Sequence, residues 1–465
     1  MNRSSTLVMA GVDHARAMSH LFPGDGKEAA AILVCTRMGG GRLKLLVREV
    51  VFVPHQSCAR EEGRLTWPSA TLDPWLDRST QGDLSLLLIH SHPNGYPEFS
   101  LLDNASDSEL MPYIYPYGHA DAACDLWHGT AIMLPGGGIK ARLYDDTMRP
   151  HAVDLVAIYG DDLRLCWNAA PDAAAPLAFS AAMREELGRL SIAIIGISGT
   201  GSVVAEQLLR MGVGELIGID DDHVEDKNLN RILNSTTADA EAERLKVDVF
   251  KDAAARINPS ACIRVLPLRI GTPEAIEAVA EADIIFSCVD SFGGRHIADR
   301  LAAAMIQPLF DVGVSIPVYH PHGETAISNV SGRVDYVQPK RSSLGDRGVY
   351  TPQRLAAEEK RARDPEAYKQ LVGEGYMPGA NEEAPSVITV NMRAASAVVQ
   401  EFIARRCPYR LESNSRYART KFDLAAEEHE YRAEESFQAT PQARAGCGLE
   451  SPLLGLPALE DLRCR

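Results

Sequence analysis

The chain has 465 residues, enough for two or three domains, and its 45% hydrophobic and 24% charged residues are ordinary for a soluble globular protein. Its formal net charge of -16 argues against a broad nucleic-acid-binding surface, which needs a basic footprint. The chain shows no signal-peptide core, no run near the roughly 20 apolar residues of a membrane span, and no C-x-x-C pair among its nine cysteines. We therefore expect a cytoplasmic protein without nucleic-acid or membrane partners.

The first part of the chain, up to about residue 165, is rich in strand-like apolar runs broken by Gly, Pro and Asp turns. The runs read AAAILVCTR, LKLLVREVVFVP, DLSLLLIH, GTAIML and VDLVAIYG, within residues 29–160. An Ala- and Pro-rich stretch follows, which predicts a linker at residues 166–180. We therefore expect a first domain at residues 1–165, built around a β-sheet.

The second part of the chain alternates strand-like and helix-like segments from residue 181 onwards. SIAIIG, ELIGID, CIRVLPL, DIIFSCV and PLFDVGV read as strands, and amphipathic segments such as SVVAEQLLRMG separate them. This alternation predicts parallel strands with helical crossovers, hence an α/β domain at residues 181–410. Past residue 410 the chain becomes polar and then Gly-, Pro- and Ala-rich, which predicts a partly flexible tail at 411–465.

The segment LLLIHSHPNGYPEFSLLD, residues 86–103, gathers metal-binding side chains at the end of a buried strand. His90 and His92 share a face because strand side chains alternate, and Ser100 can cap a helix whose first turn carries Asp103. Two imidazoles and one carboxylate are a typical ligand set for catalytic zinc, which lowers the pKa of its water to about 7. An H-x-H alone is more often an exposed loop, but Pro, Ser and Asp at these spacings favour the metal site.

This H-S-H-P-x6-S-x-x-D pattern resembles the signature of JAMM (JAB/MPN) metalloproteases, over roughly residues 20–165. The resemblance implies a mixed-sheet, cytidine-deaminase-like fold, zinc on His90, His92 and Asp103, and Ser100 as the donor to the oxyanion. The family also uses an upstream glutamate before an apolar strand as general base. Glu28 fits that place best, and Glu49 is the alternative.

A glycine-rich turn, GISGTG at residues 196–201, follows the first strand of the second part and precedes a helix. Glycines let the backbone approach a phosphate, and the helix amides then face the anion. The turn reads G-x-S-G-x-G and so departs from the G-x-G-x-x-G of dinucleotide-binding folds, which remain the plain alternative. Asp220 stands at the end of the next strand, where it can bind ribose hydroxyls.

Three downstream segments, IDDDHVEDKNLNRI, ERLKVDVF and FSCVDSFGGR, closely resemble the ThiF/MoeB/E1 family of enzymes that activate ubiquitin-like proteins. The resemblance implies a Rossmann-like fold, ATP and Mg²⁺ as cofactors, and adenylation of a carboxylate. It assigns Asp220 to the ribose, Asp222 to the metal or phosphates, and Asp290 to Mg²⁺. It places Asn228, Arg231 and Lys246 on the phosphates, beside the backbone of the turn with Gly196, Ser198, Gly199 and Gly201. The segment APSVITVN, residues 384–391, is assigned to the groove for the modifier's tail.

The cysteines depart from the ThiF/MoeB/E1 resemblance. Many relatives carry structural C-x-x-C pairs and a thioester cysteine, and this chain has no C-x-x-C pair. Cys447 lies in a glycine-flanked tail and is the most accessible candidate for a thioester carrier, while Cys288 and Cys407 read as incidental. The enzyme can equally stop at the adenylate or pass the modifier to a partner's cysteine.

Together the two parts predict a bifunctional enzyme: a zinc isopeptidase for a ubiquitin-like protein, and an ATP-dependent activator of that protein's C-terminal carboxylate. The expected partners are a Gly-Gly-ending modifier, an E2-like protein and a second copy of the chain, since E1-like folds are commonly dimers. Similar fusions occur in bacterial ubiquitin-like operons, some of them antiviral, which is an analogy only. The alternatives are sulfur-carrier chemistry for cofactor or cysteine synthesis, and a binding scaffold with inactive sites.

Overall fold

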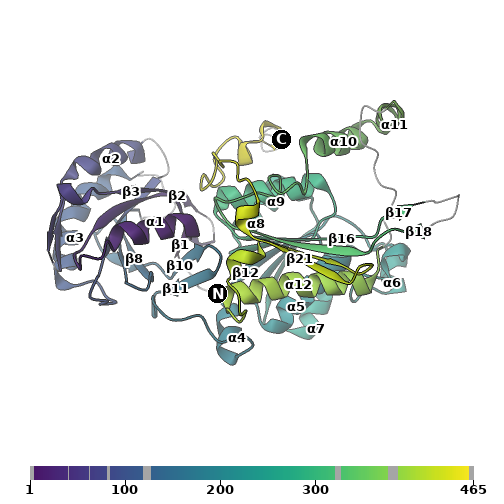
Figure 1. Cartoon of the computed structure of the whole chain (residues 1–465), viewed down its shortest axis with the longest axis horizontal. Coiled ribbons are helices and arrows are strands. Elements are labelled where there is room, and N and C mark those ends of the chain that lie inside the picture. The colour runs from purple at the N-terminus through teal and green to yellow at the C-terminus, as the bar shows by residue number, and fades with distance from the viewer. Residues whose placement is uncertain are drawn as a thin grey trace. The chain divides into compact units, whose positions relative to one another are not determined.

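The computed structural model describes residues 5–39, 41–61, 63–80, 84–118, 127–319, 326–374 and 386–459 (Figure 1). The chain forms two compact units. The first comprises Met1–Ala175, Ala304–Ile306 and Ala443–Glu450, and the second comprises Pro176–Ala303, Gln307–Gln442 and Ser451–Arg465. The main division, after residue 175, lies inside the segment 166–180, and the domain bounds given above stay predictions.

The first unit contains a large mixed sheet and a small separate hairpin. Its strands are β1 (Ser5–Ala10), β2 (Ala30–Met38), β3 (Leu43–Phe52), β4 (Ala59–Glu61), β5 (Arg64–Thr66), β6 (Leu84–Ser91), β7 (Gly129–Met133), β8 (Ile139–Tyr144), β9 (Pro150–Ala152), β10 (Leu155–Tyr159) and β11 (Leu163–Trp167). Its helices are α1 (Gly11–Leu21), α2 (Asp73–Thr80) and α3 (Leu101–Ile114). Among the described residues, nine strands join in the order β11-β10-β1-β3-β2-β6-β7-β8-β9, and β4 and β5 form a separate hairpin.

Both faces of this sheet are apolar, and each is covered by helices. Along β2 and β6, odd-numbered residues such as Leu33 and Leu87 join the core under α1. Even-numbered residues such as Ile32 and Leu88 join a second core with side chains of α2 and α3. Because side chains alternate along a strand, successive residues of β6 pack into these two cores in turn. The expected mixed-sheet fold is confirmed, and β1 and α1 add elements that the sequence analysis left unassigned.

The second unit is a doubly wound α/β structure. Its strands are β12 (Ser191–Ile195), β13 (Glu215–Ile219), β14 (Cys262–Leu266), β15 (Ile284–Ser287), β16 (Leu309–Ser315), β17 (Val318–Tyr319), β18 (Ala326–Ile327), β19 (Ser331–Val337), β20 (Arg419–Asp423) and β21 (Glu428–Arg432). Its helices are α4 (Ala181–Leu187), α5 (Gly199–Met211), α6 (Thr237–Glu241), α7 (Lys246–Ile257), α8 (Pro273–Ala280), α9 (Phe292–Met305), α10 (Pro352–Arg363), α11 (Pro365–Gly373) and α12 (Ile388–Arg406).

The sheet of this unit has the strand order β14-β13-β12-β15-β16-β19-β20-β21. The first five strands are parallel, and the last three are joined antiparallel. Figure 1 shows α5, α7 and α12 on one face and α8 and α9 on the other. The order reverses between β12 and β15, and ligands of such sheets bind at this switch point, beyond the carboxyl ends of the strands. The expected Rossmann-like fold is confirmed.

Part of the segment 411–465, predicted as a partly flexible tail, belongs to this sheet. β20 and β21 lie after residue 410, and β20 pairs with β19. Arg419 of β20 donates from Nε to the Asp335 carboxylate of β19 over 2.8 Å, and Arg347 adds a further ion pair at 3.2 Å. Asp335 is fully buried, and breaking a buried pair costs about 3–5 kcal/mol, so this stretch is held in place. Composition alone does not reveal such a long-range charge partner, and the prediction of a partly flexible tail at 411–465 stays a prediction.

Among the residues that the structure describes, no helix combines the length and the apolar character of a membrane span.

Candidate functional site

The two histidines and the aspartate meet because β6 and α3 share one face of the sheet. His90 continues the even-numbered series of β6, which faces α2 and α3, and it lies opposite Ala30 of β2. The amide of His92 donates to the Met133 carbonyl at 2.9 Å, which keeps the chain beside β7 for one residue more. Ser100 caps α3 and places Asp103 in its first turn. Strand alternation and a helix cap are thus sufficient to bring the three side chains together.

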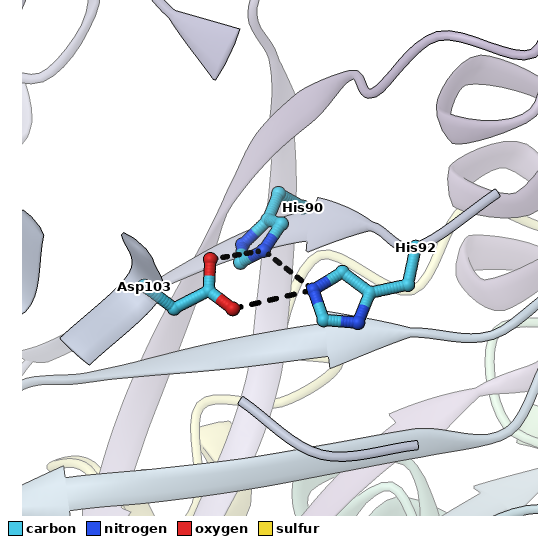
Figure 2. Close-up of side chains that lie close together, drawn as sticks. All are labelled: His90, His92 and Asp103. Carbon is cyan, nitrogen blue, oxygen red and sulfur yellow. Dashed lines mark hydrogen bonds and ion pairs between the residues drawn. The ribbon is translucent and has the colours of Figure 1, made fainter. Parts of the chain in front are cut away.

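The three side chains point at one another (Figure 2). The Nε2 atoms of His90 and His92 are 3.1 Å apart, and they lie 3.1 and 3.4 Å from the Asp103 carboxylate oxygens. All three candidate ligand atoms lie within 4.8 Å of one another. Ligands about 2.0–2.2 Å from a tetrahedral zinc are roughly 3.3–3.6 Å apart, so the spacing suits that ion. Three lone-pair-bearing atoms facing one point are also chemically incomplete without a cation or protons.

Neighbouring polar groups set the orientation and charge of these side chains. Nδ1 of His92 bonds to the Tyr96 carbonyl at 2.8 Å, so this nitrogen carries the proton and Nε2 keeps its lone pair for a ligand. Burial opposes the charging of His92, but bonds to Asp103 and Tyr96 raise its pKa overall. Burial likewise opposes the ionisation of Asp103, yet hydrogen bonds with both histidines hold its pKa far below the usual range.

Glu28 lies beside this cluster, just before β2. Burial raises the pKa of its carboxyl, the imidazoles of His90 and His92 oppose the rise, and the charge of Asp103 adds to it. Glu49, the alternative general base, lies opposite Val34, four residues further along β2 than Ala30, the partner of His90. Glu49 is also exposed. The structure therefore brings Glu28, and not Glu49, to the cluster.

Ser100 and Asp103 hold each other through a capping box. The Ser100 Oγ accepts from the Asp103 amide at 3.1 Å, and the Asp103 carboxylate accepts from the Ser100 amide at 2.6 Å. The hydroxyl proton of Ser100 remains available as a donor, because the cap uses only a lone pair of the oxygen.

Asp107, one turn further along α3, fixes this helix to the sheet. Its Oδ2 accepts from Thr130 at 2.7 Å, from Arg142 Nη2 at 2.6 Å and from the Tyr144 hydroxyl at 2.6 Å. Arg142 also donates to the Asn104 side chain at 2.6 Å. The carboxylate therefore ties the ligand-bearing helix to β7 and β8.

The glycine-rich turn of the second unit is built by close backbone approach. Gly196 has a φ of +89°, which only glycine adopts without strain. A Cβ at Gly201 would lie 1.7 Å from the Gly196 carbonyl oxygen, and one at Gly199 would lie 2.1 Å from the Asn391 side chain. Helix α5 starts at Gly199, and the Ser198 side chain does not cap it. Its first amides therefore stand at the switch point, where an anion binds well.

Of the polar residues assigned to ATP, Asp220 and Asp222 follow β13, and Lys246 is the first residue of α7. The Asp220 carboxylate accepts from the amides of Ile197 and Asp222, at 2.7 and 2.9 Å. Burial raises the pKa of the Asp220 carboxyl, while the charge of Lys246 opposes the rise. The buried Lys246 ammonium donates to the largely exposed Asp222 carboxylate at 2.7 Å. Lysine and aspartate thus neutralise each other beside the turn.

The other assigned residues lie around the same strand ends. Asn228 is buried and accepts from the Glu225 amide at 3.1 Å. The Arg231 side chain lies near Gly199 and donates to the Lys227 carbonyl at 2.6 Å. Asp290 is exposed just past β15. Asn228 and Arg231 thus follow β13 along the chain, and Asp290 follows β15.

Two residues near this point escaped the sequence analysis. Arg295 donates to the Asp290 carbonyl at 3.2 Å, and its Nε lies 3.3 Å from the buried Asp311 carboxylate. Asn391, at the start of α12, packs on Gly199. Both belong to segments quoted above for their family likeness, FSCVDSFGGR and APSVITVN, so the signal was present. Ala384 and Pro385 of the latter lie outside the described residues.

The prediction that Cys447 is an accessible thiol is wrong. The residue is 2% exposed, and burial raises the pKa of its thiol, which disfavours the reactive thiolate. The flanking glycines suggested a free loop, but the amide of Gly448 and the ion pair of Glu450 with Arg48 at 2.9 Å fasten this stretch. Cys407 is also buried, with a pKa raised to about 11, whereas Cys262 is exposed.

Two families match this chain. Residues 172–435 match the ThiF family, and residues 11–129 match the prokaryotic homologs of the JAB domain. The chain belongs to the ThiF family. It joins this ThiF region to a JAB domain, as the two sequence resemblances implied.

Curated relatives resemble only part of this ThiF-family chain. It is 30% identical over 170 residues to ubiquitin-like modifier-activating enzyme 5 of Caenorhabditis elegans. The aligned region covers 34% of this chain and 37% of that protein. It is 33% identical over 167 residues to the enzyme of the same name from Culex quinquefasciatus, covering 33% and 38%. The match therefore spans less than two fifths of the length of these relatives.

Solved structures are more distant from this ThiF-family chain. E. coli MccB with ATP has 18% identity and a TM-score of 0.40, covering 54% of this chain and 66% of that one. The microcin C7 biosynthetic enzyme MccB in complex with N-formylated MccA has 19% identity and a TM-score of 0.44, covering 57% and 70%.

Proposed function

We propose that this chain is a two-site enzyme of a ubiquitin-like pathway, in which the ThiF region adenylates the C-terminal carboxylate of a small protein and the JAB domain cleaves an amide at that carbonyl. The observation that carries the proposal is the convergence of His90, His92 and Asp103, with Glu28 beside them, in a chain that also holds a ThiF nucleotide turn. Both sites act on the same carbonyl group, which gives the fusion a chemical reason.

In the JAB domain, His90, His92 and Asp103 would hold zinc. When bound, zinc polarises a water molecule and a substrate carbonyl. Glu28 takes the proton of the attacking water and gives it to the leaving amine, for which its raised pKa suits it. The Ser100 hydroxyl donates to the carbonyl oxygen as negative charge develops there. The amide C–N bond breaks, and a carboxylate and an amine leave.

In the ThiF region, the substrate carboxylate attacks the α-phosphate of ATP, which gives an acyl adenylate and releases pyrophosphate. Asp220 orients the ribose, and Asp290 would hold Mg²⁺. Lys246, Arg231 and Asn228 neutralise or bind the phosphate oxygens as charge shifts to the leaving group. Lys246 is bonded to the Asp222 carboxylate in this structure, so ATP binding requires one of two changes. Either Lys246 leaves Asp222 for a phosphate, or both side chains move towards the phosphates and Asp222 binds Mg²⁺.

The relatives support a ubiquitin-like protein as the substrate, since two of them are named as activators of such proteins. An E2-like acceptor, a second copy of the chain and a role in antiviral defence belong to the same proposal and rest on the resemblance alone. The buried Cys447 makes an internal thioester on that residue unattractive, so the modifier would leave as the adenylate or pass to another protein.

The experiment that tests the proposal is ATP–pyrophosphate exchange, run with candidate small proteins that end in Gly-Gly, together with capture of the adenylated protein and mass spectrometry. Asp290→Ala should abolish exchange and leave peptide cleavage intact. No exchange with any such protein would favour a binding scaffold instead. A captured partner with a rhodanese-type or cofactor-synthesis context would favour sulfur-carrier chemistry.

A further inference from the structure

Arg60 lies on the small β4–β5 hairpin, outside every motif discussed above, and its side chain is only 10% exposed. Its guanidinium contacts the segment that enters β2. Nε donates to the Glu28 carbonyl at 2.7 Å, and Nη2 donates to the Lys27 carbonyl at 3.2 Å. One side chain thus binds two successive main-chain carbonyls, and one of them belongs to the candidate general base.

The same guanidinium also binds the Asp25 carboxylate in a bidentate pair, with distances of 2.9 Å from Nη1 and 3.2 Å from Nη2. The planar fork of arginine suits such pairs, and lysine, with a single point charge, cannot bind a carboxylate and two carbonyls in one plane. Residues 25–28 are therefore fastened to the hairpin by one cation. We call this set of contacts the Arg60 clamp.

The other side of Glu28 is fastened to the strand that carries the histidines. The Ala29 amide donates to the Ser91 hydroxyl at 3.0 Å, and the Ser91 amide donates to the Ala29 carbonyl at 3.0 Å. Glu28 consequently stands between two anchors. Ser91 sets its distance from the histidine strand, and the Arg60 clamp fixes the peptide group that sets the direction of its side chain.

We infer that Arg60 is a positioning residue for the amide-cleaving reaction, which holds Glu28 where it can transfer a proton between the attacking water and the leaving amine. The inference rests on the proposed function of the JAB domain. Arg60 acts through main-chain carbonyls and touches no reacting atom, so it is not itself catalytic. A displacement of about 1 Å of a proton-transfer group costs about 100-fold in rate, which sets the size of the expected effect.

The test compares Arg60→Ala with Arg64→Ala in the full chain loaded with zinc. Arg64 is a matched control, because it is an exposed arginine on the same hairpin. The probe is a synthetic peptide ending in Gly-Gly that is joined through an isopeptide bond to a lysine side chain. We expect Arg60→Ala to lower kcat about 100-fold with KM and zinc affinity unchanged, and Arg64→Ala to change none of them.

Two further measurements separate positioning from simple loss of structure. Added guanidinium should restore part of the kcat that Arg60→Ala loses. The kcat of Arg60→Lys should remain below that of the native chain. Hydrogen exchange followed by mass spectrometry should show faster exchange in residues 25–30 of Arg60→Ala and unchanged exchange in Arg64→Ala. This second readout does not depend on activity or on the bound metal.

The outcomes are distinct. A native kcat in Arg60→Ala, unchanged exchange in residues 25–30, or a parallel loss of zinc affinity overturns the positioning role. Failure of the unaltered chain to cleave any such probe overturns the proposed function instead.

Discussion

The two candidate sites are assembled in different ways. In the first unit, His90, His92 and Asp103 come from one short stretch, and their ligand atoms already lie within 4.8 Å of one another. In the second unit, the residues assigned to ATP come from a glycine turn, the segments after β13 and β15, and the start of α7, and Lys246 donates to Asp222. The candidate metal site is a local structure, whereas the candidate nucleotide site depends on strand order.

This difference has a functional consequence. A compact ligand set gains little from rearrangement, because its geometry is fixed by one strand end and one helix cap. A site spread over several strand ends contains ion pairs that a nucleotide must open or share. We therefore expect a substitution in the candidate metal cluster to abolish peptide cleavage outright and to leave adenylation unchanged.

The largest effect is expected for His92→Ala, which removes a candidate ligand and its bond to Tyr96. Zinc binding and peptide cleavage should both be lost, while pyrophosphate exchange remains at its native rate, since the ThiF residues are untouched. Zinc titration and the two activity assays check this. His151→Ala is the control, because His151 also pairs with a carboxylate, that of Asp145 at 2.7 Å, but lies outside the cluster. Loss of both activities in a folded His92→Ala chain would contradict the two-site arrangement.

A nearly equal effect on the other site is expected for Gly201→Ala. The new Cβ would lie 1.7 Å from the Gly196 carbonyl oxygen, so the turn must open. ATP binding, measured by calorimetry, and pyrophosphate exchange should disappear, with peptide cleavage retained. Gly271→Ala provides the control, because a Cβ there meets nothing within 4 Å. Native ATP binding by Gly201→Ala would mean that nucleotide does not use this turn.

A smaller effect is expected for Asp107→Asn. The substitution removes the charge that Arg142 neutralises and weakens the hold of β7 and β8 on α3. Partners of this indirect kind typically contribute about 10- to 100-fold in metal affinity or activity. Zinc affinity and cleavage should fall by that amount, and Asp146→Asn, an exposed carboxylate, should change neither. A loss as complete as that of His92→Ala would show that Asp107 acts more directly than its contacts indicate.

The smallest effect is expected for Cys447→Ser. The thiol is buried and its pKa is raised, so adenylation and any transfer to a partner should proceed at native rates. A covalent adduct between the chain and its modifier, seen on a non-reducing gel and absent in Cys447→Ser, would overturn this expectation. Cys262→Ser serves as the comparison for an exposed thiol.

Much of the candidate metal site could be predicted from the sequence, because its cause is local. Strand alternation puts His90 and His92 on one side, and the sequence predicts Ser100 as the cap of a helix whose first turn carries Asp103, which the structure forms as a capping box. The strand and helix alternation likewise predicted the parallel strands and helical crossovers of the second unit. The prediction for Cys447 was wrong because its neighbours in sequence are glycines, while the ion pair that holds this stretch comes from Arg48, far away in the sequence.

Residue type, strand period and helix capping act over a few residues, so the sequence alone was enough to predict which side chains make up the two candidate sites. The fold alone reveals which groups from other segments lie beside them: Glu28 rather than Glu49 beside the histidines, the Arg60 clamp behind Glu28, and Thr130, Arg142 and Tyr144 around Asp107. The physical reason is that such contacts depend on which strands pair and in what register. Register is set by the packing of the whole sheet, and no short stretch of sequence contains it.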